Sequence, residues 1–335
     1  MNKTTTTLAA AALLSLAGSA MAQSSVTVFG VIDLAARAVD NGATQYQLAG
    51  SGLQSSRLGF RGTEDLGGGL KANFWIEGAI NADDGNASGQ TWQRRSTIGL
   101  QGGFGEVRFG RQKNPTGLTW EQLDVFSDTG MGASGGMHRI FSVPTGGAYN
   151  SYSRSSNSIS YDTPGSTGFF GTVFVAAGEG ANGNKYTGGR VGYRAGPLFT
   201  TLAYGVTQVT GSVDAKLLTM GATYDLKVVK LFGLYSTTDL GAADQKNLMV
   251  GASMPVGKAT LRASYHKVDG GGSISNREAK KFAIGGQYDL SRRTALYTTY
   301  AKLDNSNTAL TVASGSALAT GAGSSGYEFG IRHAF

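Results

Sequence analysis

The sequence predicts an all-β protein, a 16-stranded antiparallel transmembrane β-barrel. Three observations favour this fold class. Tight-turn signals recur along the chain at a regular interval, apolar and polar residues alternate between them, and the same alternation continues through the last residues, YEFGIRHAF. The composition is compatible with strands and turns, because the 335 residues include 52 glycines but only 5 prolines.

The first segment of the chain has the pattern of a secretory signal peptide. Lys3 precedes an apolar stretch over residues 8–17, and Ala20-Met21-Ala22 supplies the small residues of a cleavage site. The apolar core is too short for a membrane anchor helix. We therefore expect a signal peptide over 1–22 and a barrel over 23–335.

The remaining composition narrows the class of protein. No later apolar run approaches the roughly 20 residues that a spanning helix needs, so a helical membrane protein is excluded. The exported chain has no cysteine and cannot be a disulfide scaffold. Stability must come from burial or from a closed hydrogen-bonded network.

Seven tight-turn signals set the strand count, because seven such turns can join eight hairpins and thus 16 strands. Most are separated by about 30 to 45 residues, enough for two strands of about 9 to 11 residues and one longer loop. The seven signals lie at 64–70, 102–106, 163–169, 194–199, 224–231, 254–260 and 289–295.

One interval between turns is about twice as long as the others. The surplus lies within 114–152, a segment that begins NPTGLTWEQLDVF. A stretch of this size without regular structure inside a compact domain is usually functional. We expect a functional loop over about 114–153.

Alternation within the strands indicates what each face of the sheet contacts. In SRLGFRG, Leu58 and Phe60 lie on one side while Arg57 and Arg61 lie on the other. The segments KANFWIE and LRASYHK alternate in the same way. Arginine opposite leucine in a short strand is expected when one face meets lipid and the other meets water.

The final strand must close the sheet, because unpaired backbone groups cannot be hydrated inside a bilayer. We expect it to pair with the first strand, around SVTVFGVIDL, and to present Tyr327, Phe329, Ile331 and Phe335 to lipid. Sixteen strands enclose a space too wide for side chains to fill, so an aqueous channel remains.

The whole mature chain resembles the general-diffusion porins of the Gram-negative outer membrane, most of all their anion-selective betaproteobacterial branch. The resemblance is carried by SSVTVFGVIDL, SRLGFRGTEDLGGGLKANFWIE, DDGNAS, RRSTIGL, FGEVRFGRQ, LDVFSDTG, NSISY, LSRRTALY and GIRHAF. It implies a multi-pass outer-membrane homotrimer in contact with lipid and lipopolysaccharide. It also implies that the third loop folds into the lumen and that the barrel assembly machinery recognises Phe335.

Arginines are the candidate selectivity residues, since a ring of one charge in a narrow aqueous passage enriches the opposite ion. Arg57, Arg61 and Arg154 share the polar parity of their strands. The resemblance places a basic constriction cluster on Arg57, Arg94 and Arg154, and alternation does not decide between Arg94 and Arg95. The alternative is that these arginines only form wall salt bridges with acids such as Glu77.

Acidic candidates come from the predicted loop and the wall. The loop offers Glu121, Asp124 and Asp128. The resemblance makes Asp124 a loop-side constriction acid and Glu77 a wall acid, so that a transverse field would cross the passage. The alternative is that Asp124 or Asp128 caps a turn within the loop.

These observations predict a porin for passive diffusion of ions and small hydrophilic solutes, with an anion preference and no cofactor or metal. One alternative is a solute-specific channel for organic acids or phosphate. An outer-membrane barrel enzyme is disfavoured, because only His138, His266 and His333 could serve as histidine bases and no serine partner is signalled. Nucleic-acid binding is disfavoured because the chain has no basic run.

Overall fold

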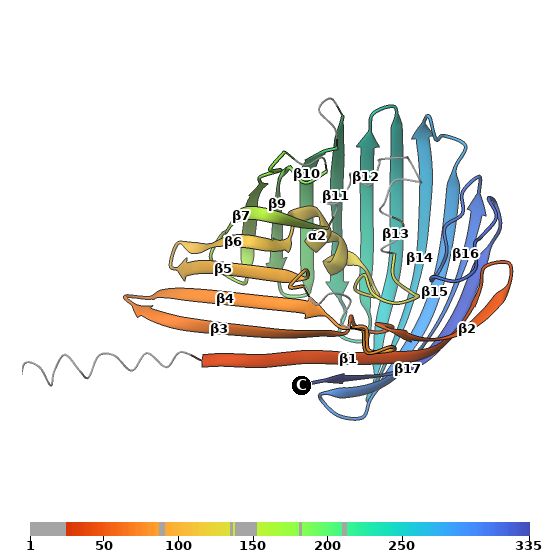
Figure 1. The fold of residues 1–335 in the computed structure, drawn as a ribbon, viewed down its shortest axis with the longest axis horizontal. Helices are drawn as coiled ribbons and strands as arrows, with labels where there is room; N and C mark the ends of the chain where they lie inside the picture. Colours follow the sequence, from red (N-terminus) through yellow and green to blue (C-terminus); the bar gives the residue numbers. More distant parts are fainter. Residues whose placement is uncertain (1–24, 87–90, 135–136, 138–152, 181–182, 210–212) are drawn as a thin grey trace, which may run out of the picture.

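A computed structural model describes residues 25–86, 91–134, 137, 153–180, 183–209 and 213–335 (Figure 1). It is a closed antiparallel β-barrel in which 17 strand segments are hydrogen-bonded in one sheet. The predicted signal peptide at 1–22 lies outside the described residues.

The sheet is built from strands of 7 to 16 residues, and one helix follows β6. The strands are β1 Ser25–Asp40, β2 Thr44–Gly50, β3 Arg57–Gly67, β4 Leu70–Ala79, β5 Arg95–Gly102, β6 Gly105–Lys113, β7 Arg154–Asp162, β8 Gly168–Ala176, β9 Tyr186–Ala195, β10 Leu198–Gln208, β11 Asp214–Asp225, β12 Lys230–Leu240, β13 Ala243–Val256, β14 Ala259–Gly272, β15 Glu278–Asp289, β16 Thr294–Ser306 and β17 Ser324–Ala334. The helix is α2, Pro115–Leu123.

Seventeen segments fill 16 wall positions because one wall strand is interrupted. β1 pairs with β2 through residues 34–40 and with β3 through residues 25–31, so β2 and β3 follow one another along the same side of β1. The interruption is the segment 51–56. The predicted barrel of 16 strands is therefore confirmed, with one extra strand that sequence reasoning did not foresee.

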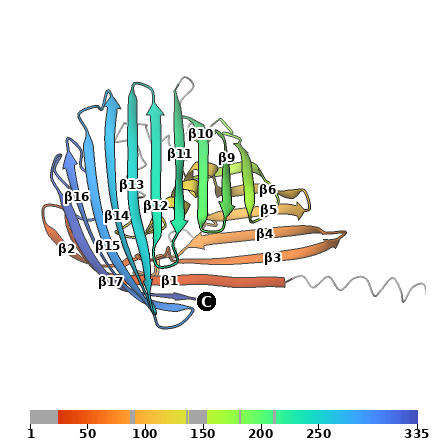
Figure 2. The same ribbon diagram turned by 180° about the vertical axis from the view of Figure 1, so that it is seen from behind.

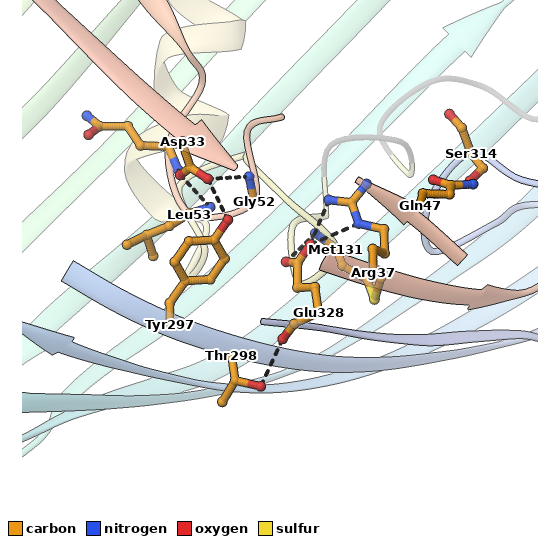
Figure 3. Close-up of polar contacts among 11 residues, drawn as sticks. Asp33, Arg37, Gln47, Gly52, Leu53, Met131, Tyr297, Thr298, Ser314 and Glu328 are labelled. Atoms are coloured by element: carbon orange, nitrogen blue, oxygen red, sulfur yellow. Dashed lines mark hydrogen bonds and ion pairs between the residues drawn. The ribbon is translucent and has the colours of Figure 1, made fainter. Parts of the chain in front are cut away.

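A buried carboxylate on β1 holds this interruption in place (Figure 3). Asp33 is fully buried, and its side-chain oxygens accept hydrogen bonds from the backbone N–H groups of Gly52 (3.1 Å), Leu53 (2.9 Å) and Gln54 (2.6 Å). The Tyr297 hydroxyl on β16 donates to the same carboxylate. Backbone donors that lack a sheet partner are thus satisfied by one side chain.

All seven predicted tight turns occur where the sequence placed them. They connect β3 to β4, β5 to β6, and each later odd-numbered strand up to β15 to the strand that follows it. The first of these turns requires glycine, because Gly67, Gly68 and Gly69 have positive φ angles of 85°, 61° and 82°. Residues with a Cβ rarely adopt this conformation.

The two faces of the wall differ as alternation predicted. On β14, Leu261 and Tyr265 are exposed, whereas His266 is buried. On β17, the exposed apolar residues are Tyr327, Phe329, Ile331 and, directly after the strand, Phe335. The exposed apolar face matches a barrel wall that contacts lipid.

The barrel closes between its first and last strands, as expected. β17 pairs with β1 through Val31–Asp40, and the backbone of Phe335 exchanges two hydrogen bonds with Gly30. The pairing lies further along β1 than the sequence suggested, because the preceding half of β1 protrudes beyond β17 and pairs with β3.

The segment after β6 packs on the face of the wall opposite the exposed apolar one, and in Figure 1 α2 lies in front of the central strands. Its apolar side chains sit against glycines of alternate strands. The contacts are Leu123 with Gly221 of β11, Val125 with Gly251 of β13, Phe126 with Gly285 of β15 and Met131 with Gly326 of β17. Among the described residues, no helix is long and apolar enough to cross a membrane.

Candidate functional site

Four cationic side chains gather where neighbouring wall strands begin or end on the loop side. Arg57 opens β3, Arg94 directly precedes β5, Lys113 ends β6 and Arg154 opens β7. We call these four residues the basic cluster. Lys113 and Arg154 are cross-strand partners, so the sheet register itself places like charges side by side.

Glu77 on β4 is the centre of the cluster's contacts. Its Oε1 lies 2.6 Å from Arg94 Nε and 3.8 Å from Arg57 Nε. Its Oε2 accepts a hydrogen bond from Trp75 Nε1–H at 3.1 Å. Arg154 joins by donating from Nε to the Arg94 carbonyl oxygen at 3.0 Å. One carboxylate therefore orients two guanidiniums, and a backbone carbonyl orients the third.

The helix α2 brings an acid to the other side of the cluster. Asn114 caps the helix by accepting from Gly117 N–H at 2.9 Å, and Pro115 occupies the first turn, both favourable at a helix start. Glu121, two turns along, forms an ion pair with Lys113.

Positive charge dominates the space between these groups. A cavity of about 260 Å³ is lined by the basic cluster together with Arg95, Arg108, Glu77 and Glu121. Six cations thus face two carboxylates. The salt-bridge alternative and the selectivity hypothesis are both compatible with this geometry, because pairing to Glu77 leaves the cavity strongly basic.

The structure places both Arg94 and Arg95 on the same cavity. Arg95 is the cross-strand partner of Glu77, while the Arg94 backbone N–H donates to the Glu77 carbonyl at 3.1 Å. Alternation failed to separate them because Arg94 lies outside the strand, where parity no longer applies.

Arg61 and Arg95 line a second cavity, of about 430 Å³, nearer the tight turns. Their guanidinium carbons lie 5.2 Å and 4.6 Å from the ring centroid of Trp75. Arg61 is therefore separated from the basic cluster, while Arg95 contributes to both cavities.

Asp124 makes contacts within the segment that follows α2. It is buried, and its oxygens accept from Phe126 N–H (2.7 Å), Ser134 N–H (2.8 Å) and the Ser134 hydroxyl. Burial raises the pKa of Asp124, against the opposing effect of these hydrogen bonds. The contacts correspond to the turn-capping alternative. Asp128 lies in the same turn with a left-handed φ of 54°.

Sequence reasoning did not assign two of the cationic residues to the site. Lys113 is the last residue of β6, and Arg108 on the same strand forms an ion pair with Asp162. Arg108 could have been found in FGEVRFGRQ, where it alternates with Val107 and the exposed Phe109. Lys113 could not be assigned to the site without knowing that β6 ends at this residue.

The structure locates two further residues that the sequence singled out, Phe335 and His266. Phe335 bonds to Gly30 and its ring covers the space that a Cβ at Gly30 would need. His266 is buried beside Trp120, with ring centroids 5.8 Å apart, and His138 lies outside the described residues. In the described part of the chain, no group of three or more His, Asp or Glu side chains is arranged to hold a metal ion.

Comparison with known proteins agrees on one family. The family model described as Gram-negative porin matches residues 7–308. The chain is 42% identical over 352 residues to outer membrane porin protein 32 of Delftia acidovorans, covering 98% of this chain and 99% of that protein.

Solved structures agree with the fold. The anion-selective porin from Comamonas acidovorans matches with a TM-score of 0.85 and 37% identity, over 93% of this chain and 100% of that one. OmpT of Vibrio cholerae in its trimer form matches with a TM-score of 0.68 and 16% identity, over 93% and 99% of the two chains. The second likeness concerns the fold alone.

Proposed function

The chain belongs to the family of Gram-negative porins, and from this premise we propose that its basic cluster makes the channel prefer anions. The protein is an outer-membrane channel for passive diffusion and not an enzyme. Selectivity must then arise from the charges that line the water-filled passage, because no bond is made or broken.

The observation that carries the proposal is the charge balance of the 260 Å³ cavity, where six cations face two carboxylates. Low-dielectric walls focus the field of such charges into the passage. A unit charge about 8 Å from a passing ion in water contributes roughly 0.5 kcal/mol. A few unbalanced arginines are thus enough to favour one ion sign severalfold.

We also propose that the loop over about 114–153 narrows the passage. Support comes from its described part, whose apolar side chains rest on glycines of four alternate strands. Glu121 of this segment reaches Lys113 of the wall. The loop and the basic cluster would then border the same narrow point.

The assembled protein is proposed to be a homotrimer, made after removal of residues 1–22 and recognised through Phe335 by the barrel assembly machinery. It would lie among outer-membrane lipids and lipopolysaccharide. The porin fold and the trimer form of the structurally similar OmpT support the homotrimer.

Reversal potentials across a salt gradient test the anion preference. We expect purified protein in planar bilayers with unequal KCl to pass chloride in preference to potassium. Arg57→Gln, Arg94→Gln and Arg154→Gln should each lower the chloride-to-potassium permeability ratio by roughly twofold, because each removes one nearby charge.

Arg292→Gln is the matched control, because it removes the same charge from the exposed turn between β15 and β16. Its permeability ratio should equal that of the unmodified protein. If all three cluster variants kept the original reversal potential, the basic cluster would not set the ion preference.

A further inference from the structure

The outer wall of β11–β16 carries a repeated order of side chains. Going from the apolar band toward the loops, five of these six strands present an apolar residue, then a lysine, then an acid, at alternate positions. On β14 the order is Tyr265, Lys267, Asp269. Figure 2 shows these tall strands side by side. The lysines are Lys216, Lys246, Lys267, Lys280 and Lys302, which we call the lysine belt, and the acids are Asp214, Asp244, Asp269, Glu278 and Asp304.

The lysine belt points away from the lumen. On β15 the residues on either side of Lys280, Ala279 and Lys281, are buried, and on β16 the neighbours of Lys302 are buried as well. The side chains of Lys280 and Lys302 are 46% and 57% exposed. The belt is therefore separate from the basic cluster and from the passage.

Its height on the wall corresponds to lipid headgroups. Phe282 and Tyr300 lie two residues closer to the tight turns and are exposed, as expected of the aromatic girdle of a barrel. Because long loops face the outside and short turns face the periplasm, the belt lies at the outer leaflet. Five strand spacings of about 4.8 Å give it a width of roughly 24 Å.

The acids hold the lysines from the loop side. Lys267 Nζ lies 2.7 Å from Asp269 Oδ1 and 3.3 Å from Glu278 Oε2, and Lys280 Nζ lies 2.6 Å from Glu278 Oε1. The acids stand about 6.7 Å further out along the strands. Each ammonium group thus has a carboxylate above it and apolar wall below it. An anion that approaches from the membrane side meets lysines first.

We propose that the lysine belt binds the phosphate groups of a phosphorylated outer-leaflet lipid, which in this membrane is lipopolysaccharide. The inference rests on the outer-membrane location of the porin and not on its ion preference. Phosphate suits the belt because several ammonium groups at one level match a headgroup with more than one negative charge, while its acyl chains would lie on the apolar residues below. Carboxylates above the belt keep anions in bulk water from binding equally well.

Titration of labelled lipopolysaccharide against the full-length porin in detergent tests the proposal. A lysine near an anionic headgroup layer strengthens binding about fivefold. The triple variant Lys246→Gln, Lys267→Gln, Lys280→Gln should therefore bind roughly 100-fold more weakly. The matched control, Lys71→Gln, Lys227→Gln, Lys258→Gln, removes three lysines at the tight-turn end and should bind within about twofold of the original.

Two further binding measurements identify the chemical group that the porin recognises. Lipopolysaccharide freed of its phosphates should bind the unmodified porin as weakly as the triple variant does, and inorganic phosphate should compete only at far higher concentration. Unchanged conductance of the triple variant in planar bilayers would show that its barrel is folded. Equal binding by the triple variant, or equal binding of the dephosphorylated lipid, would overturn the proposal while leaving the ion preference untouched.

Discussion

Glu77 illustrates how a single residue can both pair charges and leave a site charged. Its carboxylate is shared by Arg57, Arg94 and the Trp75 indole. Glu77 is buried, and its contacts fix the positions of two guanidiniums. Pairing to Glu77 and an excess of positive charge in the cavity therefore occur together.

Removal of this carboxylate should make the passage more basic. We expect Glu77→Gln to raise the chloride-to-potassium permeability ratio roughly twofold, because one negative charge beside the passage is lost. The glutamine retains an oxygen that accepts from the Trp75 indole. Reversal potentials in unequal KCl measure the change, with Glu64→Gln near the β3–β4 turn as the control. A fall in the ratio would mean that guanidinium position matters more than total charge.

At the scale of the strands, turns were predictable and interruptions were not. The seven tight turns have local signals in glycine and small polar residues, and all seven were located. The gap between β2 and β3 depends on Asp33, which contacts residues about 20 positions later and Tyr297 on a distant strand. A contact between residues so far apart leaves no pattern in the local sequence.

Alternation also fails where a strand is irregular. The pairing of β6 with β7 shifts register between Gly110 and Gln112, and Asn157 on β7 has a left-handed φ of 54°. Arg154 lies before this irregularity and Ile159 after it, so parity could not securely relate the two. Arg154 nevertheless reaches the basic cluster, because it opens its strand beside Lys113.

The glycines beneath the loop should control its position. A Cβ at Gly285 would lie 2.9 Å from the Phe126 ring, whereas one at Gly233 would meet nothing within 4 Å. Gly285→Val should therefore push the loop away from the wall and lower single-channel conductance. Gly233→Val, on β12, should leave conductance unchanged. Equal conductance of both variants would show that the loop does not border the passage.

For the whole molecule, barrel closure could be predicted from the sequence because the last strand alternates up to its final residue. The register of the closure could not, since the sequence does not show that β17 pairs with Val31–Asp40 while the preceding residues of β1 pair only with β3, on the other edge. The basic cluster was predictable only in part. Arg57, Arg94, Arg154 and Glu77 come together, whereas Asp124 turns into its own segment because backbone donors there need an acceptor.

Deletion of Phe335 should weaken this closure. The change removes the two backbone hydrogen bonds to Gly30 and the ring that covers it. We expect a lower temperature for the loss of the folded band in heat-modifiability gels and a smaller yield in the outer membrane. Phe104→Ala, in the exposed β5–β6 turn, removes a similar aromatic area as a control. A barrel of unchanged heat stability and yield would contradict the expectation.

The pairing of β1 with β17 makes completion of the chain a condition for entering the membrane. A chain that lacks β17 would have two unpaired edge strands. Their backbone amide and carbonyl groups could not be hydrated among acyl chains. A chain that lacks β17 is therefore expected to insert poorly. Closure of the hydrogen-bonded sheet thus makes membrane insertion depend on the last strand of the chain.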